Sequence, residues 1–312
     1  MSSPSSTTSM SRGNGFQAIT ESLAGLLVEL PTPFTGDQVL DLPAFQRLVR
    51  RALAGGAAGV VILGCTGEAS ALEEVERDVL LASALEAAEG RPVVAGTGSC
   101  STRQTIAWTR KARQQGASAA MVVTPYYNQP TQAGLEAHFR AITEAVPDLP
   151  LILLNHPART GVNLDPATLR NLWRIPEVVG IKEAGGSLAQ LAQIAGTLPP
   201  GKLLLAGDDG LAAESLALGA QGLASVLGSA YPECVAELVR VARAGRTREA
   251  ALLQEVLRPL TDALQFESNP IPIKALLKSL GLCGHQVRLP LLPASPGTRA
   301  VLSVAVRRAM VA

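Results

Sequence analysis

The sequence has few aromatic residues and little net charge, and both shortages exclude classes of protein. Its 312 residues include two tryptophans, three tyrosines and five phenylalanines, with a net charge of +1 and no basic cluster. Nothing therefore indicates a nucleic-acid partner. A membrane span needs about 18 consecutive apolar residues, and glycine, proline or charge interrupts every apolar run before that length. We expect no membrane partner and a cytoplasmic location.

Cysteine and histidine are also scarce. The four cysteines, Cys65, Cys100, Cys234 and Cys283, show no CxxC spacing, and the three histidines form no HExxH pattern. Such spacings are what structural and catalytic metal sites require. The sequence therefore predicts free thiols and no metal.

The content of apolar residues is high enough for a large core. Hydrophobic residues make up 47% of the chain and the mean hydropathy is +0.24. A chain of this length fits one barrel of about 250 residues with an appendage as well as it fits two domains. Its first segment, residues 1–20, begins with a stretch rich in Ser, Thr and Gly and has no apolar core of a signal peptide. We expect a disordered leader there.

Eight short apolar runs alternate with amphipathic segments in the middle of the chain. This alternation favours a parallel sheet covered on both faces, and eight units favour closure into a (β/α)8 TIM barrel over residues 21–230. The predicted strands are Leu26–Leu30, Gly59–Leu63, Pro92–Gly96, Ala119–Thr124, Leu151–Asn155, Val178–Lys182, Leu203–Ala206 and Gly222–Val226. Residues 231–312 carry only helical periodicity, which predicts a C-terminal helical appendage.

Lys182 is the leading candidate for a nucleophile. Only five of the 27 basic residues are lysines, and this one ends the apolar run Val178–Lys182. Burial disfavours the charged form of an amine, and the neutral amine is the form that attacks a carbonyl carbon to give a Schiff base. The alternative is a strand-end lysine that reaches solvent or pairs with Glu183.

Other polar residues follow the remaining predicted strands. In a TIM barrel the loops after the strands form the active site, so we expect these residues to gather around Lys182. The segments are Gly64-Cys65-Thr66-Gly67, Tyr126-Tyr127-Asn128, Asn155-His156-Pro157-Ala158-Arg159 and Gly207-Asp208. Loop packing, turn formation and helix capping also explain Tyr126, Asn128 and Asp208 without any chemistry.

Taken in order, these segments resemble the dihydrodipicolinate synthase family of the N-acetylneuraminate lyase superfamily. The similarity extends from about Gly25 to Pro293 and includes Gly96-Thr97-Gly98 after the third strand. It also includes Ser268-Asn269-Pro270-Ile271-Pro272-Ile273-Lys274 and Arg288-Leu289-Pro290 in the tail. Each piece alone is weak, but the ordered set is highly specific.

The resemblance implies a class I aldol-type lyase of the carbon–oxygen lyase kind that needs no cofactor. Its substrates would be pyruvate, bound to Lys182 as a Schiff base, and L-aspartate 4-semialdehyde. The product, 4-hydroxy-tetrahydrodipicolinate, lies on the route to diaminopimelate and lysine. Thr66 and the Gly64–Gly67 turn, including Cys65, would bind the pyruvate carboxylate, and Arg159 the carboxylate of the aldehyde. Gly207 would lie beside the site.

Tyr127 matches a tyrosine that, in this family, enters the active site of the partner subunit. The resemblance therefore implies a homodimer or homotetramer. It also implies lysine feedback only where an asparagine and a glutamate follow the third strand, and this chain has Cys100 and Gln104 there. We expect lysine to inhibit weakly or not at all.

Leu154 departs from the family pattern, which has a relay tyrosine at this position. Losing a positioned acid–base group costs about 10²- to 10⁴-fold in rate. In one explanation His156, two residues on and expected on the same inward face, titrates near neutrality and serves as the relay. In a second, the protein is a related pyruvate-dependent aldolase or keto-sugar-acid dehydratase. In a third, it is a catalytically impaired homologue.

Overall fold

The computed structural model describes residues 6–309, with side chains from residue 15 onward, and its centre is a closed barrel of eight parallel strands. Each strand pairs with the next along the chain, and the last pairs with the first. The strands are β1 (Leu26–Glu29), β2 (Gly59–Ile62), β3 (Val93–Gly96), β4 (Ala119–Val123), β5 (Leu151–Asn155), β6 (Val178–Glu183), β7 (Leu203–Ala206) and β8 (Gly222–Ser225). The predicted TIM barrel and all eight predicted strands are confirmed.

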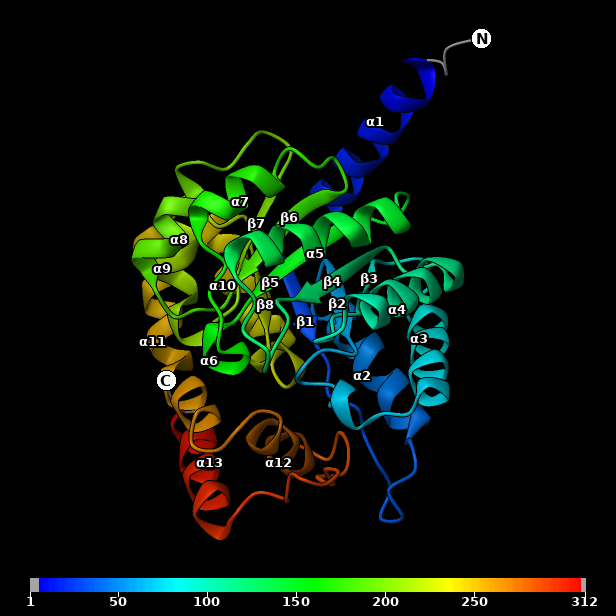
Figure 1. Ribbon diagram of the computed structural model, residues 1–312. Helices are drawn as coiled ribbons and strands as arrows, with labels where there is room; N and C mark the ends of the chain where they lie inside the picture. The colour runs from blue at the N-terminus through cyan, green and yellow to red at the C-terminus, as the bar shows by residue number, and fades with distance from the viewer. Residues whose placement is uncertain (1–5, 310–312) are drawn as a thin grey trace.

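Helices surround the barrel, as Figure 1 shows. Several begin at a polar cap: Ser101 and Thr131 accept hydrogen bonds from the backbone of the first turns of α4 and α5. The helices are α2 (Leu42–Ala54), α3 (Glu74–Ala88), α4 (Thr102–Gln115), α5 (Gln132–Ala145), α6 (Pro157–Thr160), α7 (Pro166–Leu172), α8 (Leu188–Ala195), α9 (Ala212–Ala217) and α10 (Pro232–Arg243). Short 3₁₀ turns follow at η1 (Ala69–Ala71), η2 (Asp209–Leu211) and η3 (Leu227–Ser229).

The C-terminal appendage is helical, as predicted, and consists of α11 (Thr247–Leu264), α12 (Ile271–Ser279) and α13 (Pro296–Ala309). The predicted boundary at residue 230 cuts through a βα unit, because α10 packs against β8, β1 and α2 and completes the helical ring. None of the described helices is long and apolar enough to cross a membrane.

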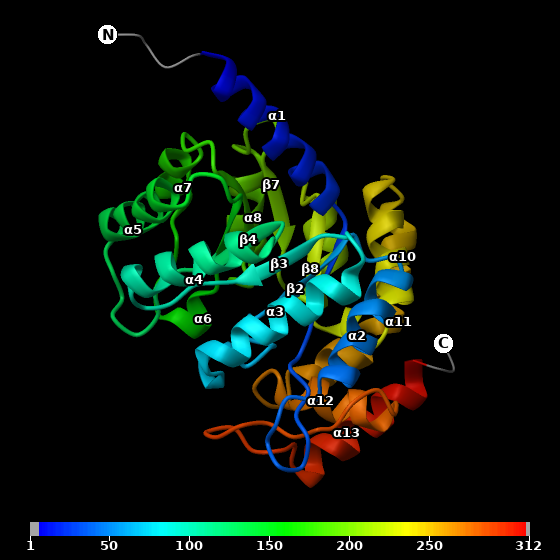
Figure 2. The same cartoon turned by 90° about the vertical axis from the view of Figure 1, so that its right-hand side faces the viewer.

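Residues 1–5 of the disordered leader expected for residues 1–20 lie outside the described residues, and the remainder of that segment differs from the expectation. Within the described residues it forms α1 (Ser6–Leu23), which projects from the end of the barrel opposite α12 and α13 (Figures 1 and 2). Phe16, Ile19 and Leu23, three and four residues apart, pack on the apolar cluster inside the barrel. Burial of these apolar side chains at the open end of the barrel stabilises the helix, and the polar composition of the segment gave no indication of this contact.

The barrel contains an inner and an outer apolar layer. Successive side chains of a strand point to opposite faces, so Leu27 and Leu205 lie inside whereas Val28 and Leu204 lie under the helices. The inner cluster includes Leu27, Val61, Val94, Ala119, Met121, Ile152, Val179, Leu203, Leu205 and Ala224. These residues fill the N-terminal part of the barrel interior, and the polar side chains lie at the C-terminal ends of the strands.

Candidate active site

A register shift in β6 aims Lys182 into the barrel. Leu151 pairs with Val178 but Ile152 pairs with Gly180, so β6 has an extra residue at this point. Val179 belongs to the inner cluster and Ile181 to the outer one, which shows that the strand has reversed its alternation. Such bulges re-aim side chains. Lys182 consequently points inward and is only 4% exposed.

The Lys182 amine forms an ion pair with Glu29 at the end of β1. Both side chains are largely buried, at 6% and 12% exposure. Glu183, the pairing partner considered from the sequence, lies on the other face of β6 and accepts hydrogen bonds from Asn155 and from the backbone of Gly185. A buried charge needs a partner of opposite sign, and the structure supplies it from a strand 153 residues away in sequence.

Gly207 lies against the lysine side chain. A Cβ placed there would be 2.7 Å from the Lys182 Cε and 2.6 Å from the Ala184 Cβ, closer than such atoms approach. The predicted neighbourhood of Gly207 and Lys182 is therefore present. Any larger residue at 207 would push the amine from its position.

Thr66 adjoins the same carboxylate from the loop after β2. Its hydroxyl donates to Glu29 Oε2 at 3.3 Å and accepts from Asn269 Nδ2 at 2.9 Å. The threonine is 1% exposed. Lys182, Glu29, Thr66 and Asn269 thus form one continuous polar chain that runs from the barrel interior to the C-terminal region.

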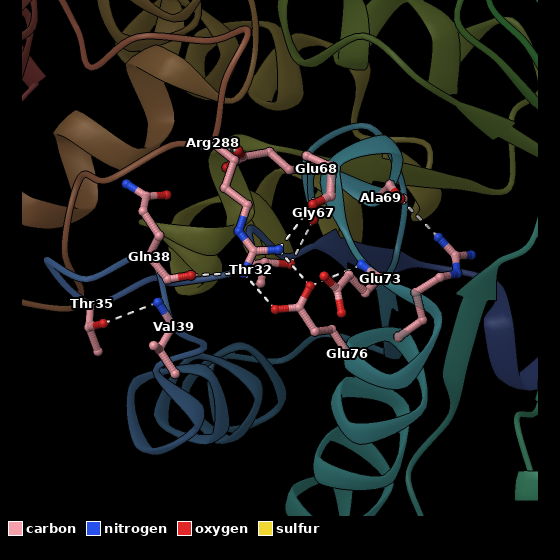
Figure 3. Close-up of polar contacts among 12 residues, drawn as sticks. Thr32, Thr35, Gln38, Val39, Gly67, Glu68, Ala69, Glu73, Glu76 and Arg288 are labelled. Carbon is pink, nitrogen blue, oxygen red and sulfur yellow. Dashed lines mark hydrogen bonds and ion pairs between the residues drawn. The ribbon is translucent and has the colours of Figure 1, made fainter.

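The loop that carries Thr66 is held by buried charges. Lys274 of α12 forms an ion pair with Glu68, and both side chains are almost completely buried. Arg288 reaches the same loop: its backbone donates to Glu68 Oε2 at 2.8 Å and its guanidinium binds both carboxylate oxygens of Glu76, as Figure 3 shows. Bidentate pairs of this kind fix geometry as well as charge. The C-terminal region therefore fixes the position of Thr66.

Arg159 and Cys65 lie at the exposed rim of the site. Arg159 lies in the short helix α6, and its guanidinium donates to the carbonyl of Asn269 at 3.5 Å. The Cys65 thiol lies 4.0 Å from the same carbonyl. Gly64 has no heavy atom within 4 Å of the place where a Cβ would stand, so the turn before Thr66 borders open space. These groups form the exposed edge of the site.

His156 lies beside the site but in a different state from the one expected. It is not part of β5; it precedes α6 with φ −144° and ψ 71°. Burial, with the charges of Lys182 and Arg159, lowers its pKa to about 4. The imidazole is therefore neutral near pH 7, which differs from the expected titration near neutrality, and its buried Nδ1 has no hydrogen-bond partner.

Tyr127 projects into solvent within the single chain. Its side chain is 93% exposed, and its backbone adopts φ 75° in the left-handed region, which is uncommon for a residue with a bulky side chain. Two other candidates make structural hydrogen bonds of the kind considered from the sequence. Asn128 donates to the carbonyl of Cys100 at 3.3 Å, and Asp208, after β7, caps η2 through Gly210.

Most of the chain matches one family of known proteins. The model of the dihydrodipicolinate synthetase family covers residues 22–309. A 4-hydroxy-tetrahydrodipicolinate synthase of Stenotrophomonas maltophilia is 46% identical over 275 residues, which are 88% of this chain and 92% of that protein. The chain belongs to the dihydrodipicolinate synthetase family.

Solved structures of the family agree with this assignment. A dihydrodipicolinate synthase from Acinetobacter baumannii, described as complexed with pyruvate, gives a TM-score of 0.90 at 39% identity and covers 93% of this chain and all of its own. A monomeric dihydrodipicolinate synthase variant gives a TM-score of 0.91 at 35% identity, with 94% and 99% covered. The prediction of a lyase of the dihydrodipicolinate synthase type is thus confirmed.

Leu154, at the position of the family's relay tyrosine, faces the barrel interior. It packs on the inner apolar cluster and is the register partner of Lys182. The inward direction expected for it is therefore present, and the side chain offers no proton. Among the residues with described side chains, no three His, Cys, Asp or Glu side chains are grouped to hold a metal.

Glu29 is the site residue that the sequence interpretation missed. The signal was the one used for Lys182: a single charged residue in the apolar run Leu26–Leu30, next to the predicted strand end. Charged side chains are seldom buried unless they are paired. A search for such residues in every predicted strand would have found Glu29 together with Lys182.

Proposed function

We propose that the protein condenses pyruvate with L-aspartate 4-semialdehyde to give 4-hydroxy-tetrahydrodipicolinate, through a Schiff base on Lys182. The supporting observation is the buried Lys182 amine, aimed into the barrel at the C-terminal ends of the strands. Family members named as this synthase, and one described in complex with pyruvate, support the choice of substrates.

The pyruvate carboxylate binds at the turn Gly64-Cys65-Thr66-Gly67. The turn lies beside Lys182, with the Thr66 hydroxyl and Glu29 forming the link between them. Backbone N–H groups of such turns favour anions. The second carboxylate, on the aldehyde, binds Arg159, whose planar guanidinium is exposed at the rim and suits a bidentate partner.

The chemistry needs no added cofactor. The amine condenses with the keto carbon, loss of a methyl proton from the iminium gives an enamine, and the enamine carbon attacks the aldehyde. A protonated imine stabilises the electron pair that a metal would stabilise in other aldolases. Gly207 leaves the space in which Lys182 lies.

The active unit is a homodimer or homotetramer in the cytoplasm. The exposed Tyr127, held in a left-handed backbone conformation, supports this proposal because strained residues persist where surrounding contacts or function require them. In a dimer its ring would enter the partner's site. The relatives include a monomeric variant, so the oligomeric state is a property to measure for this chain.

A second candidate is a related pyruvate-dependent aldolase or keto-sugar-acid dehydratase. The specific observation that favours it is Leu154, an apolar residue that pairs with Lys182 in the register of the sheet. Such a reaction shares the Schiff base and differs in the second substrate.

Borohydride trapping tests the proposal. The protein is incubated with pyruvate and sodium borohydride, and the peptide containing Lys182 is examined by mass spectrometry, with Lys202→Gln as a control that retains the adduct. We expect a reduced pyruvyl adduct on Lys182. Its absence would favour the catalytically impaired homologue, whereas an adduct with turnover of longer keto acids instead of aspartate semialdehyde would favour the second candidate.

A further inference from the structure

The Glu29 carboxylate touches the Lys182 amine and the Thr66 hydroxyl at the same time. One oxygen forms the ion pair with the amine and the other accepts the hydroxyl hydrogen bond at 3.3 Å. At 12% exposure the Glu29 side chain is largely but not completely buried. This arrangement places a carboxylate between the nucleophile and the loop proposed to bind the substrate.

An ammonium group has no lone pair for attack on a carbonyl. A neighbouring base must accept its proton, and the same group must then return protons as the carbinolamine loses water. Among the described residues, Glu29 is the carboxylate in contact with Lys182. The buried Nδ1 of His156 has no hydrogen-bond partner among the described residues, and Leu154 carries no titratable group.

We propose that Glu29 is a catalytic acid–base residue of the Schiff-base chemistry. This inference rests on the proposed function. Glu29 takes a proton from the Lys182 ammonium, and the free amine forms a C–N bond with the pyruvate keto carbon. The π electrons of the carbonyl move to its oxygen, which takes the proton from Glu29.

The same carboxylate completes the sequence. It accepts the second proton of the nitrogen and delivers it to the carbinolamine hydroxyl, so the C–O bond breaks and water leaves. The protonated imine that remains is balanced by the Glu29 carboxylate. Glu29 then removes one proton from the pyruvate methyl carbon, and the C–H electron pair forms the enamine double bond.

Thr66 and Asn269 orient this carboxylate. The Asn269 amide donates to the Thr66 hydroxyl, which directs the hydroxyl hydrogen toward Glu29 Oε2. Glu29 is therefore fixed by groups on two sides, which is the condition for a pre-organised proton acceptor. A purely structural ion pair would need only the contact with Lys182.

Deuterium exchange at the pyruvate methyl group tests the role without any aldehyde. Proton NMR in D₂O follows the exchange that enamine formation causes, in the wild type and in Glu29→Gln. We expect exchange to fall at least about 100-fold in Glu29→Gln, as for loss of a positioned general base. The matched control is Glu183→Gln, which removes a buried carboxylate one residue from Lys182 on the opposite face and should leave exchange unchanged.

Chemical rescue separates catalysis from structure. Glu29→Ala leaves a space that formate can enter, so added formate should raise its exchange rate, whereas Glu29→Gln, whose amide fills the space, should not respond. If circular dichroism shows that Glu29→Gln does not fold, Glu29→Asp replaces it. This variant keeps a carboxylate but holds it one methylene further from Lys182. The pyruvate methyl protons should then exchange slowly, with the pH profile of the wild type.

The outcomes distinguish this inference from the proposed function. A wild-type protein that forms no borohydride adduct would overturn the proposed function and the role of Glu29 with it. If the wild type forms the adduct, two results would overturn the role of Glu29 alone. One is an exchange rate in Glu29→Gln equal to that of the wild type. The other is an exchange rate in Glu29→Ala that added formate does not change.

Discussion

Leu154 and Lys182 are register partners on β5 and β6, and both side chains face the barrel interior. The position next to Lys182 that carries a tyrosine in the pattern the chain resembles is therefore occupied by an apolar group. If that position alone limits the synthase reaction, Leu154→Tyr should raise kcat for pyruvate with aspartate semialdehyde by about tenfold or more, since a positioned acid–base group contributes at least about 10²-fold. A coupled assay measures this. Leu153→Met on the outer face is the control, and an unchanged or lower rate would mean that Glu29 already performs the proton transfers.

His156 offers a second test of the proton relay. Its pKa of about 4 keeps the imidazole neutral from about pH 6 upward, so it should not produce a limb in the pH–rate profile near neutrality. We expect His156→Gln to keep the shape of that profile and to lose less than about tenfold in kcat. Abolished turnover, or loss of a neutral limb, would instead establish His156 as the relay considered from the sequence.

Gly207→Ala should impair the enzyme through the position of the lysine. The added methyl would meet the Lys182 Cε at 2.7 Å, so the amine must move. A misplacement of this order costs about 10²-fold in rate, and the rate of borohydride-trapped adduct formation measures it. Gly36→Ala, where a Cβ meets no atom within 4 Å, is the matched control. Equal rates in both variants would contradict the placement of Gly207.

His138 should make the protein less stable in mild acid. It is 5% exposed, and burial lowers its pKa to about 4. The unfolded chain therefore binds the proton more tightly than the folded one. The stability is complete above about pH 6.5 and falls as the pH approaches 4, by about 2 kcal/mol at pH 5.

Urea denaturation of the wild type and of His138→Gln, at about pH 7.5 and about pH 5, measures that loss. The free energy of unfolding should fall by about 2 kcal/mol less in the variant than in the wild type. Equal losses in both proteins would show that His138 is not the residue responsible.

Lysine should inhibit weakly or not at all. Gln104, where feedback-sensitive relatives carry a glutamate, offers an amide, and its nitrogen donates to Glu74 at 3.3 Å. Glu74 is in turn 3.7 Å from the Lys111 ammonium, so its charge already has a partner. An ammonium ligand without an ionic partner loses several kcal/mol where the site is partly buried. Inhibition at sub-millimolar lysine, measured beside a feedback-sensitive synthase, would contradict this prediction.

The barrel could be predicted from the sequence because each strand is recognisable from its own residues. Runs such as Val178–Lys182 and Leu203–Ala206 are apolar, short and bounded by turn residues, and these properties depend on neighbours in the chain. The direction of the Lys182 side chain could not be predicted in the same way. It depends on the register shift at Gly180, which only the pairing of β5 with β6 reveals.

Other parts of the site depend on contacts that no local pattern contains. Glu29 meets Lys182 across 153 residues, and Asn269 meets Thr66 across 203. The state of His156 was predicted from its ordinary pKa, whereas burial beside two cations determines it in the structure. The helix at Ser6–Leu23 likewise owes its stability to the barrel end that its apolar stripe covers.

The anchoring of the Thr66 loop by residues near the far end of the chain has a consequence for biosynthesis. Glu68 binds Lys274 and the backbone of Arg288, which lie 206 and 220 residues later in the chain. A nascent polypeptide that has already produced all eight strands still lacks these groups while the ribosome translates the last helices. The Thr66 loop therefore gains its full set of anchors only after residue 288 has been translated, and a premature stop codon before Lys274 would leave Glu68 without both partners.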